Sequence, residues 1–154
     1  MTPCATHEAM TFAEKACARA IEQYLPEDMP MFRFENPGRT DCAVFDIGTP
    51  MNGDLFATKA KALAYNAKLT LYKRDHDALQ AAIMHLISSF PVNADLSADH
   101  ELRETSNVIL LRVSVGGSPI SAISREEIDM RNGQSVSTCR VDITFDVVFA
   151  VQFD

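Results

Sequence analysis

Histidine and carboxylate side chains are the groups in this sequence that could transfer protons or bind a metal ion. The four histidines are dispersed along the chain, at His7, His76, His85 and His100. On one helix, His76 and His85 would be about two and a half turns apart, which is too far to share a metal ion. Asp75 and Asp77 flank His76 and could in principle orient a general base, but a capped helix start is favoured. We therefore expect no metal site.

The sequence patterns for a catalytic nucleophile or a phosphate-binding loop are as weak as those for a metal site. Gly116, Gly117 and Ser118 superficially resemble the setting of a nucleophile, but they lack the G-x-S-x-G elbow. The sequence contains no G-x-G-x-x-G or Walker motif that would bind phosphate. Glu126 and Glu127 are adjacent, so their side chains point in different directions and make a poor acid–base pair. We expect no catalytic residue, no cofactor and no enzymatic activity.

Charge and cysteine usage limit the possible partners. The formal net charge is −7 with 14 Lys and Arg residues, which argues against free binding to nucleic acid because phosphate neutralisation needs clustered cations. No C-x-x-C pair suggests zinc or redox chemistry. Free thiols are therefore the favoured interpretation of the four scattered cysteines, Cys4, Cys17, Cys42 and Cys139.

Length and hydropathy predict one domain over residues 1–154, made in a cytoplasm and soluble. The N-terminus lacks the basic flank and apolar run of a secretory signal. No stretch approaches the roughly 18 apolar residues that a membrane span needs. A chain of 154 residues is long enough for a single core, and 47% apolar with 23% charged residues argues against wholesale disorder.

The strongest structural signal is the closing stretch from Cys139 to Phe153. Every odd position from Val141 to Phe153 is apolar, which predicts a strand with one fully apolar face. The even positions are polar up to Asp146, but Val148 and Ala150 are apolar, and only Gln152 restores polarity. A terminal segment that is apolar on both faces predicts a central strand or a subunit contact.

The remaining elements follow from apolar periodicity and turn signals. Helices are predicted at Glu8 to Leu25 and Asp75 to Phe90. Strands are predicted at Met31 to Glu35, Ala43 to Ile47, Leu63 to Lys73 and Val108 to Val115, the last an antiparallel neighbour of the closing strand. Leu55 to Ala62 could be a hairpin arm or a helical turn, and Asn93 to Ser106 is predicted to be a polar loop.

The segment from Gly116 to Thr138 is predicted to be a long loop between the two best strands. It is far longer than a tight hairpin turn, and loops of this length are usually functional or disordered. Asn132-Gly133 is a turn signal within it, and a solvated excursion is the simplest interpretation. Its charged residues are Arg125, Glu126, Glu127, Asp129 and Arg131.

The order and spacing of these elements resemble the tail terminator or tail-completion proteins of long-tailed bacteriophages. The resemblance covers most of the chain: an N-terminal amphipathic helix, short strands around MFRFE and AVFDI, the strand AKLTLY leading directly into HDALQAAIMHLISSF, and the final strand VDITFDVVFAVQF. Its most characteristic parts are the strand–helix pair from Leu69 to Phe90 and the aromatic-rich closing strand.

The resemblance implies an α+β fold, with a mixed, mainly antiparallel sheet and two main helices packed on it. It also implies a homo-hexameric ring in the neck region of the virion tail, which ends tube polymerisation and joins tail to head. The partners would be further copies of the chain, the tail-tube protein and a head connector or stopper, with DNA only in transit through the lumen and no membrane.

The resemblance also suggests roles for two groups of residues. Val148, Ala150 and Gln152 would contribute to the subunit interface, because a ring needs a lateral contact and the outer face of the closing strand turns apolar there. The charged loop residues Arg125, Glu126, Glu127, Asp129 and Arg131 would face the lumen or the tube.

Two alternatives remain open. A head-side connector or stopper would bind portal or adaptor proteins rather than the tail tube. A small α+β enzyme or ligand-binding domain belongs to a different class, and would be a monomer with a concave apolar cavity and convergent polar groups.

Overall fold

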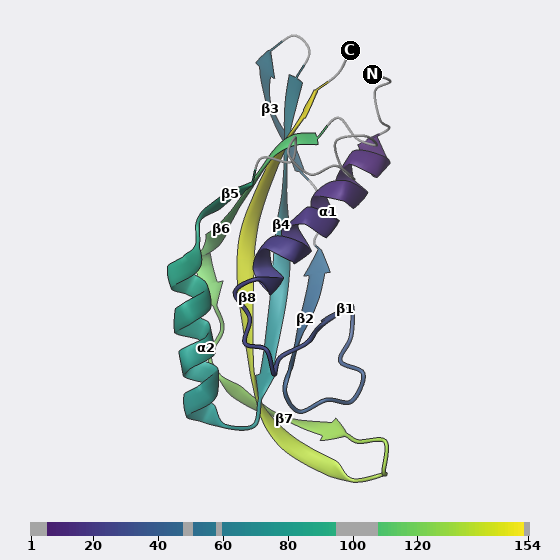
Figure 1. The fold of residues 1–154 in the computed structure, drawn as a ribbon, viewed down its shortest axis with the longest axis vertical. Coiled ribbons are helices and arrows are strands. Elements are labelled where there is room, and N and C mark those ends of the chain that lie inside the picture. Colours follow the sequence, from purple (N-terminus) through teal and green to yellow (C-terminus); the bar gives the residue numbers. More distant parts are fainter. Residues whose placement is uncertain (1–5, 48–50, 58–59, 95–107, 153–154) are drawn as a thin grey trace.

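Two long strands, β4 (Ala60–Lys73) and β8 (Ser135–Gln152), form the centre of the fold (Figure 1). The computed structural model describes residues 6–47, 51–57, 60–94 and 108–152. The two strands pair antiparallel from Ala60 opposite Gln152 to Lys73 opposite Cys139. The closing stretch is therefore a central strand, as its apolar alternation predicted.

Six strands follow one path across the sheet in the order β1-β2-β4-β8-β6-β5, while β3 also pairs with β4 and β7 with β8. The β1–β2 pair is parallel and the other pairs are antiparallel. The mixed, mostly antiparallel α+β fold expected from the sequence is confirmed. The remaining strands are β1 (Met31–Arg33), β2 (Cys42–Ile47), β3 (Met51–Ala57), β5 (Val92–Ala94), β6 (Val108–Ile120) and β7 (Ser124–Asp129).

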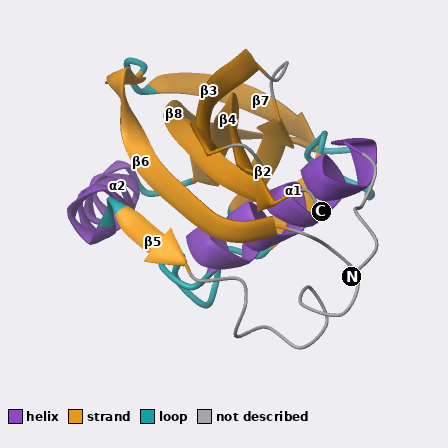
Figure 2. Cartoon of the chain, turned by 90° about the horizontal axis from the view of Figure 1, so that it is seen from above, coloured by secondary structure: helices purple, strands orange, loops and turns teal. Residues whose placement is uncertain are grey.

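Both helices, α1 (Thr6–Glu22) and α2 (His76–Ser89), pack on the same side of the curved sheet (Figure 2). Ile21 of α1 and Leu79 of α2 share one core with Phe45, Phe145 and other odd-numbered residues of β8. Asp75 caps α2 by accepting a hydrogen bond from the Asp77 backbone N–H at 3.1 Å, as predicted. Neither helix in the described ranges is long and apolar enough to cross a membrane.

The opposite side of the sheet, called here the polar face, carries Lys68, Thr70, Arg140 and Asp142. Paired residues of neighbouring strands share a face, so Thr70 and Asp142 lie side by side. A second, smaller apolar cluster also lies on this side, made of Cys42, Val44, Tyr72 and Ile128, with Phe32 and Met130 packed against it.

The prediction of a long loop from Gly116 to Thr138 is wrong. Strand β6 continues to Ile120, and β7 forms a hairpin with the first part of β8, from Ser124 opposite Arg140 to Asp129 opposite Ser135. The turn of this hairpin contains Asn132-Gly133, where the sequence signalled it, and Gly133 has a φ of +83°. In Figure 1 the β7–β8 hairpin projects beyond the body of the molecule.

The strand pairing also tests the predictions for two further segments. Leu55 belongs to the β3 arm that pairs with β4, so the hairpin alternative for Leu55 to Ala62 is correct. Within the predicted polar loop from Asn93 to Ser106, residues Asn93 and Ala94 belong to strand β5, and positions 95–107 lie outside the described residues.

Candidate functional site: the junction of the β1–β2 loop and the β7–β8 hairpin

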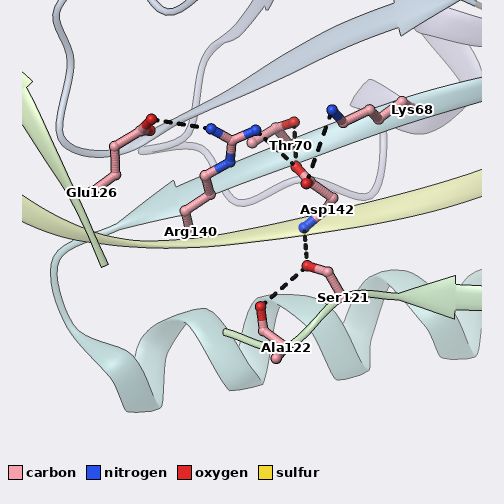
Figure 3. Close-up of polar contacts among 7 residues, drawn as sticks. All are labelled: Lys68, Thr70, Ser121, Ala122, Glu126, Arg140 and Asp142. Atoms are coloured by element: carbon pink, nitrogen blue, oxygen red, sulfur yellow. Dashed lines mark hydrogen bonds and ion pairs between the residues drawn. The ribbon is translucent and has the colours of Figure 1, made fainter. Parts of the chain in front are cut away.

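Ser121 and Asp142 fix the point at which the hairpin leaves the sheet (Figure 3). The Ser121 backbone N–H donates to the Asp142 carbonyl oxygen at 2.9 Å, and the Asp142 N–H donates to the Ser121 hydroxyl oxygen at 2.9 Å. This reciprocal pair ties the end of β6 to the middle of β8. The chain then turns through Ser121 to Ile123 and enters β7.

Charged side chains hold the same region on the polar face. The Asp142 carboxylate accepts a 2.8 Å hydrogen bond from Thr70 Oγ1 and lies 3.5 Å from Arg140 Nη2 and 3.9 Å from Lys68 Nζ. Arg140 Nη1 also lies 3.1 Å from Glu126 Oε1 of β7. Glu126, one of the predicted loop residues, therefore anchors the hairpin to the sheet through Arg140.

Burial and neighbouring charges shift the pKa values of three groups in this region. Burial raises the pKa of Tyr72 to about 12 and the pKa of the Cys42 thiol to about 11. Partial burial opposes the charge on Arg140, but Tyr72, Asp142 and Glu126 more than offset it, so the pKa of Arg140 is raised. Tyr72 and Cys42 thus stay neutral at physiological pH and Arg140 stays charged.

The β1–β2 loop, residues 34–41, is held in a strained and well-defined conformation. Phe34 has a φ of +73°, and the Glu35 N–H donates to the Arg33 carbonyl oxygen at 2.9 Å, which makes a γ-turn of the rare form with positive φ. Asn36 then accepts hydrogen bonds from the backbone of Gly38 at 2.9 Å and of Arg39 at 2.7 Å. The Asn36-Pro37-Gly38 sequence is typical of a turn, and these bonds close one here.

This loop touches the hairpin at Gly38. A Cβ atom on Gly38 would lie 3.0 Å from the Asp129 carbonyl oxygen, and the φ of Gly38 is +97°. The position therefore needs glycine both for its conformation and for close approach. On the sheet side of the contact, Thr138 Oγ1 donates to the Thr40 carbonyl oxygen at 2.7 Å.

Four surface cavities surround the loop. One of about 250 Å³ lies beside Phe34 and Glu35 and reaches Lys68, Thr70 and Arg140 on the polar face. A second, of about 350 Å³, is lined by Phe32, Pro37, Gly38, Arg39, Met130 and Arg131. The other two, of about 400 and 390 Å³, are both lined in part by Gly38. The junction is thus a hollowed surface whose lining mixes aromatic and charged groups.

The structure brings four of the five predicted charged residues to this junction. Glu126, Glu127 and Asp129 line the 400 Å³ cavity, and Arg131 lines the 350 Å³ cavity. Arg125 is exposed on β7 and its Nη1 lies 3.5 Å from Ser137 Oγ. These residues belong to an ordered hairpin rather than to a loop.

The predicted interface residues lie elsewhere on β8. Val148 is 37% exposed and sits between Ala64 and Arg112 of the neighbouring strands. Ala150 and Gln152 continue the strand opposite Ala62 and Ala60, and their side chains lie outside what the structure describes. Val148 is eight residues from Arg140, or about 26 Å along the strand, so the two predicted groups form separate surfaces.

Sequence reasoning missed Phe34 and the aromatic lining of the junction. The Asn-Pro-Gly turn marked the loop, but nothing in the local sequence signals a positive φ at a phenylalanine. Within the described ranges no three His, Cys, Asp or Glu side chains are grouped so that they could hold a metal ion.

Comparison of the sequence with protein-family models and with curated proteins finds no match.

Proposed function

We propose that this protein is a structural ring subunit, a phage tail terminator that closes the head-proximal end of the tail tube and joins it to the head. The observation that carries the proposal is the projecting β7–β8 hairpin, whose surface is charged and whose root is fixed by the Ser121–Asp142 and Glu126–Arg140 contacts (Figures 1 and 3). A two-stranded hairpin is marginally stable alone, so a fixed and projecting one suits a contact with another molecule.

The free edge of β7 supports the same conclusion. Among the described strands, β7 pairs only with β8, so its outer edge is open to a strand of another chain up to Asp129, where Gly38 of the β1–β2 loop approaches the carbonyl oxygen. Of its side chains only Ile128 is buried, and Ile128 anchors the hairpin to the Cys42–Tyr72 cluster. The other side chains are at least partly accessible to a partner.

The charge pattern agrees with a ring through which DNA passes. The chain carries a formal charge of −7, and an acidic lumen would let DNA pass without sticking. In this proposal the charged residues of the hairpin face the lumen or the tube, and copies of the chain associate side by side.

The experiment that tests the proposal combines native mass with binding. Light scattering and negative-stain microscopy of the purified protein are expected to show a six-fold ring with an open centre, or a monomer that assembles on tail-tube protein. Binding to portal or adaptor but not to the tube would favour the head-side connector. A monomer that binds neither would contradict both versions.

A further inference from the structure

Strand β7 has a backbone edge whose open groups can be identified from its pairing with β8. The Met130 N–H donates to the Gln134 carbonyl oxygen at 2.8 Å, which fixes the hydrogen-bonded pairs of the β7–β8 ladder. These pairs alternate along an antiparallel ladder, so the even-numbered residues of β7 bond to β8. Arg125, Glu127 and Asp129 therefore direct their N–H and C=O groups away from β8, toward the open edge.

A groove follows this edge. In Figure 1, β7 lies between the first part of β8 and the β1–β2 loop. The 400 Å³ cavity is lined there by residues 36–38 of the loop, residues 126–129 of β7 and Tyr72. Gly38 limits it at the Asp129 carbonyl oxygen. A residue of an added strand occupies on the order of 160 Å³, from its rise and the strand and sheet spacings, so the cavity holds about two residues.

The edge of β1 lacks such an opening. The Phe34 N–H donates to the Phe45 carbonyl oxygen of β2, so the preceding residue, Arg33, directs its backbone groups away from β2. The Arg33 carbonyl oxygen is then used inside the chain, because it accepts the Glu35 N–H at 2.9 Å. The strained turn at Phe34 thus blunts the edge of β1, as proteins commonly do to prevent strand addition. The edge of β7 stays open.

The groove is acidic. Glu126, Glu127 and Asp129 contribute carboxylates, and its other lining residues are uncharged. Arg140 lies 3.1 Å from Glu126 Oε1, but Glu126 Oε2 is buried without a hydrogen-bond partner among the described residues. No cation of the described ranges forms an ion pair with Glu127 or Asp129. A basic side chain would supply both a donor and the opposite charge, so the groove favours a basic ligand.

The same charges restrict which strand can pair with β7. Charged side chains on an edge strand prevent indiscriminate pairing, because like charges directly opposite each other are destabilising and opposite charges are stabilising. Glu126 and Glu127 are consecutive, so they lie on opposite faces of β7. A complementary strand therefore carries two consecutive basic residues, one for each face.

From these observations we infer that β7 binds an extended segment of a partner protein with two consecutive basic residues, one opposite Glu126 and one opposite Glu127. The segment adds a strand to the open edge, where its backbone bonds to Arg125 and Glu127. The inference rests on the proposed function for the identity of the partner, and it specifies the chemistry by which the tail-tube protein docks on the hairpin.

The first test uses a blocked synthetic peptide, Thr-Val-Lys-Lys-Val-Thr, as the probe. The matched control peptide is Thr-Val-Glu-Glu-Val-Thr, which replaces two opposite-charge pairs with two like-charge pairs. Titration followed by NMR is expected to show about tenfold weaker binding of the glutamate peptide. With the lysine peptide, amide exchange is expected to slow at Arg125 and Glu127 and to stay unchanged at Ile128, whose N–H already faces β8.

Variants at Glu127 separate backbone pairing from charge. Glu127→Pro removes an N–H that does not bond to β8, so the melting temperature is expected to change little while binding of the lysine peptide is lost. Glu127→Gln keeps the N–H and removes the charge, so binding is expected to weaken without being lost. Asp146→Asn is the control, because it removes one exposed carboxylate of β8 outside the groove, and binding is expected to be unchanged.

The opposite results would overturn the docking site. Equal binding of the two peptides would remove the charge complementarity, and binding that protects neither Arg125 nor Glu127 would remove the strand addition. If Glu127→Pro lowers the melting temperature, Glu127→Gln decides, since unchanged affinity for the lysine peptide contradicts the inferred contact. Each of these results leaves the ring to be tested by native mass. A monomer that binds the lysine peptide but neither tube nor head protein would remove the proposed function and keep the docking site.

Discussion

Tyr72 and Cys42 make the stability of this protein sensitive to alkaline pH. Burial raises the pKa of Tyr72 from 10.0 to about 12 and that of Cys42 from 9.0 to about 11, so the folded state holds both protons more tightly than the unfolded state. The stability that these two groups provide is fully present below pH 9 and is lost as the pH rises toward 12. Urea unfolding at a series of pH values is expected to show a falling free energy of unfolding above pH 9.

The Tyr72→Phe variant isolates the tyrosine contribution. Phenylalanine cannot ionise, so the variant is expected to lose less stability than the wild type between pH 10 and pH 12. Identical slopes for the two proteins over that range would show that the Tyr72 hydroxyl is not protected from ionisation by the fold.

Asp142 makes contacts with three other side chains of the polar face. It accepts a hydrogen bond from Thr70 and lies close to Arg140 and Lys68 (Figure 3). Its side chain is 31% exposed, so solvent screens part of the interaction, and Asp142→Asn is expected to lower the free energy of unfolding by only about 1 kcal/mol.

The structural consequence of this change is expected at the hairpin root. Amide hydrogen exchange in β7 should accelerate, because Arg140 loses the charge of one of its two carboxylate neighbours. Asp146→Asn is the matched control on the same face of β8, where the side chain is exposed. Equal effects of the two substitutions would mean that net charge, rather than the local network, governs the hairpin.

Substitution of two glycines measures how much the close contact between the β1–β2 loop and the hairpin limits the side chain at Gly38. Gly38 and Gly133 both have positive φ, but an added Cβ meets the Asp129 carbonyl oxygen at 3.0 Å at Gly38 and nothing within 4 Å at Gly133. Gly133→Ala is therefore expected to cost about 1 kcal/mol from backbone strain alone, and Gly38→Ala about 1 kcal/mol more. Denaturant unfolding compares them, and equal losses would show that the loop and the hairpin do not press on each other.

Elements that bury one regular face were predictable from the sequence. Strand β8 alternates strictly because Val141, Ile143, Phe145 and Val147 all face the helix-covered core. Helix α2 was predictable in the same way, since its buried residues recur at helical spacing after an N-cap. Strand β4 was predictable from its apolar alternation. Its first residues have both helical and strand propensity, so the sequence left two alternatives there.

The hairpin and the junction were not predictable, for a physical reason. Strand β7 has charged or polar residues on both faces and buries only Ile128, so its sequence carries no period. Pairing with β8 and the packing of Ile128 on the Cys42–Tyr72 cluster decide its structure, and both are contacts between segments distant along the chain. The conformation of Phe34 was not predictable for a similar reason, because it depends on contacts with β2 and with the Asn36 turn.

At the scale of the whole molecule, the chain presents two separate surfaces along β8. The junction of loop and hairpin lies at the end where β8 begins, and Val148 lies toward the other end, on the same polar side of the sheet. A subunit in a ring contacts neighbours on two sides, and the ring must also meet a tube or a connector. Two surfaces about 26 Å apart on one rigid strand pair suit contacts with different molecules.

Replacing Val148 with Asp tests the second surface without removing the fold. Val148 is 37% exposed and lies opposite Arg112, so an aspartate there gains an oppositely charged cross-strand neighbour. The melting temperature is therefore expected to fall by only about 2–4 °C, which corresponds to roughly 1 kcal/mol for a chain of this size. Ring formation or tube binding, measured by native mass and co-sedimentation, is expected to be lost.

Thr144→Asp is the matched control for Val148→Asp. It adds the same charge to the same face of β8, again opposite a cation, Lys68, but at a position between the two surfaces. If Val148→Asp abolishes assembly and Thr144→Asp does not, the apolar end of β8 is a binding surface. If both variants assemble normally with unchanged melting temperatures, the apolar character of Val148 serves neither fold nor assembly, and Val148 is not part of a subunit contact.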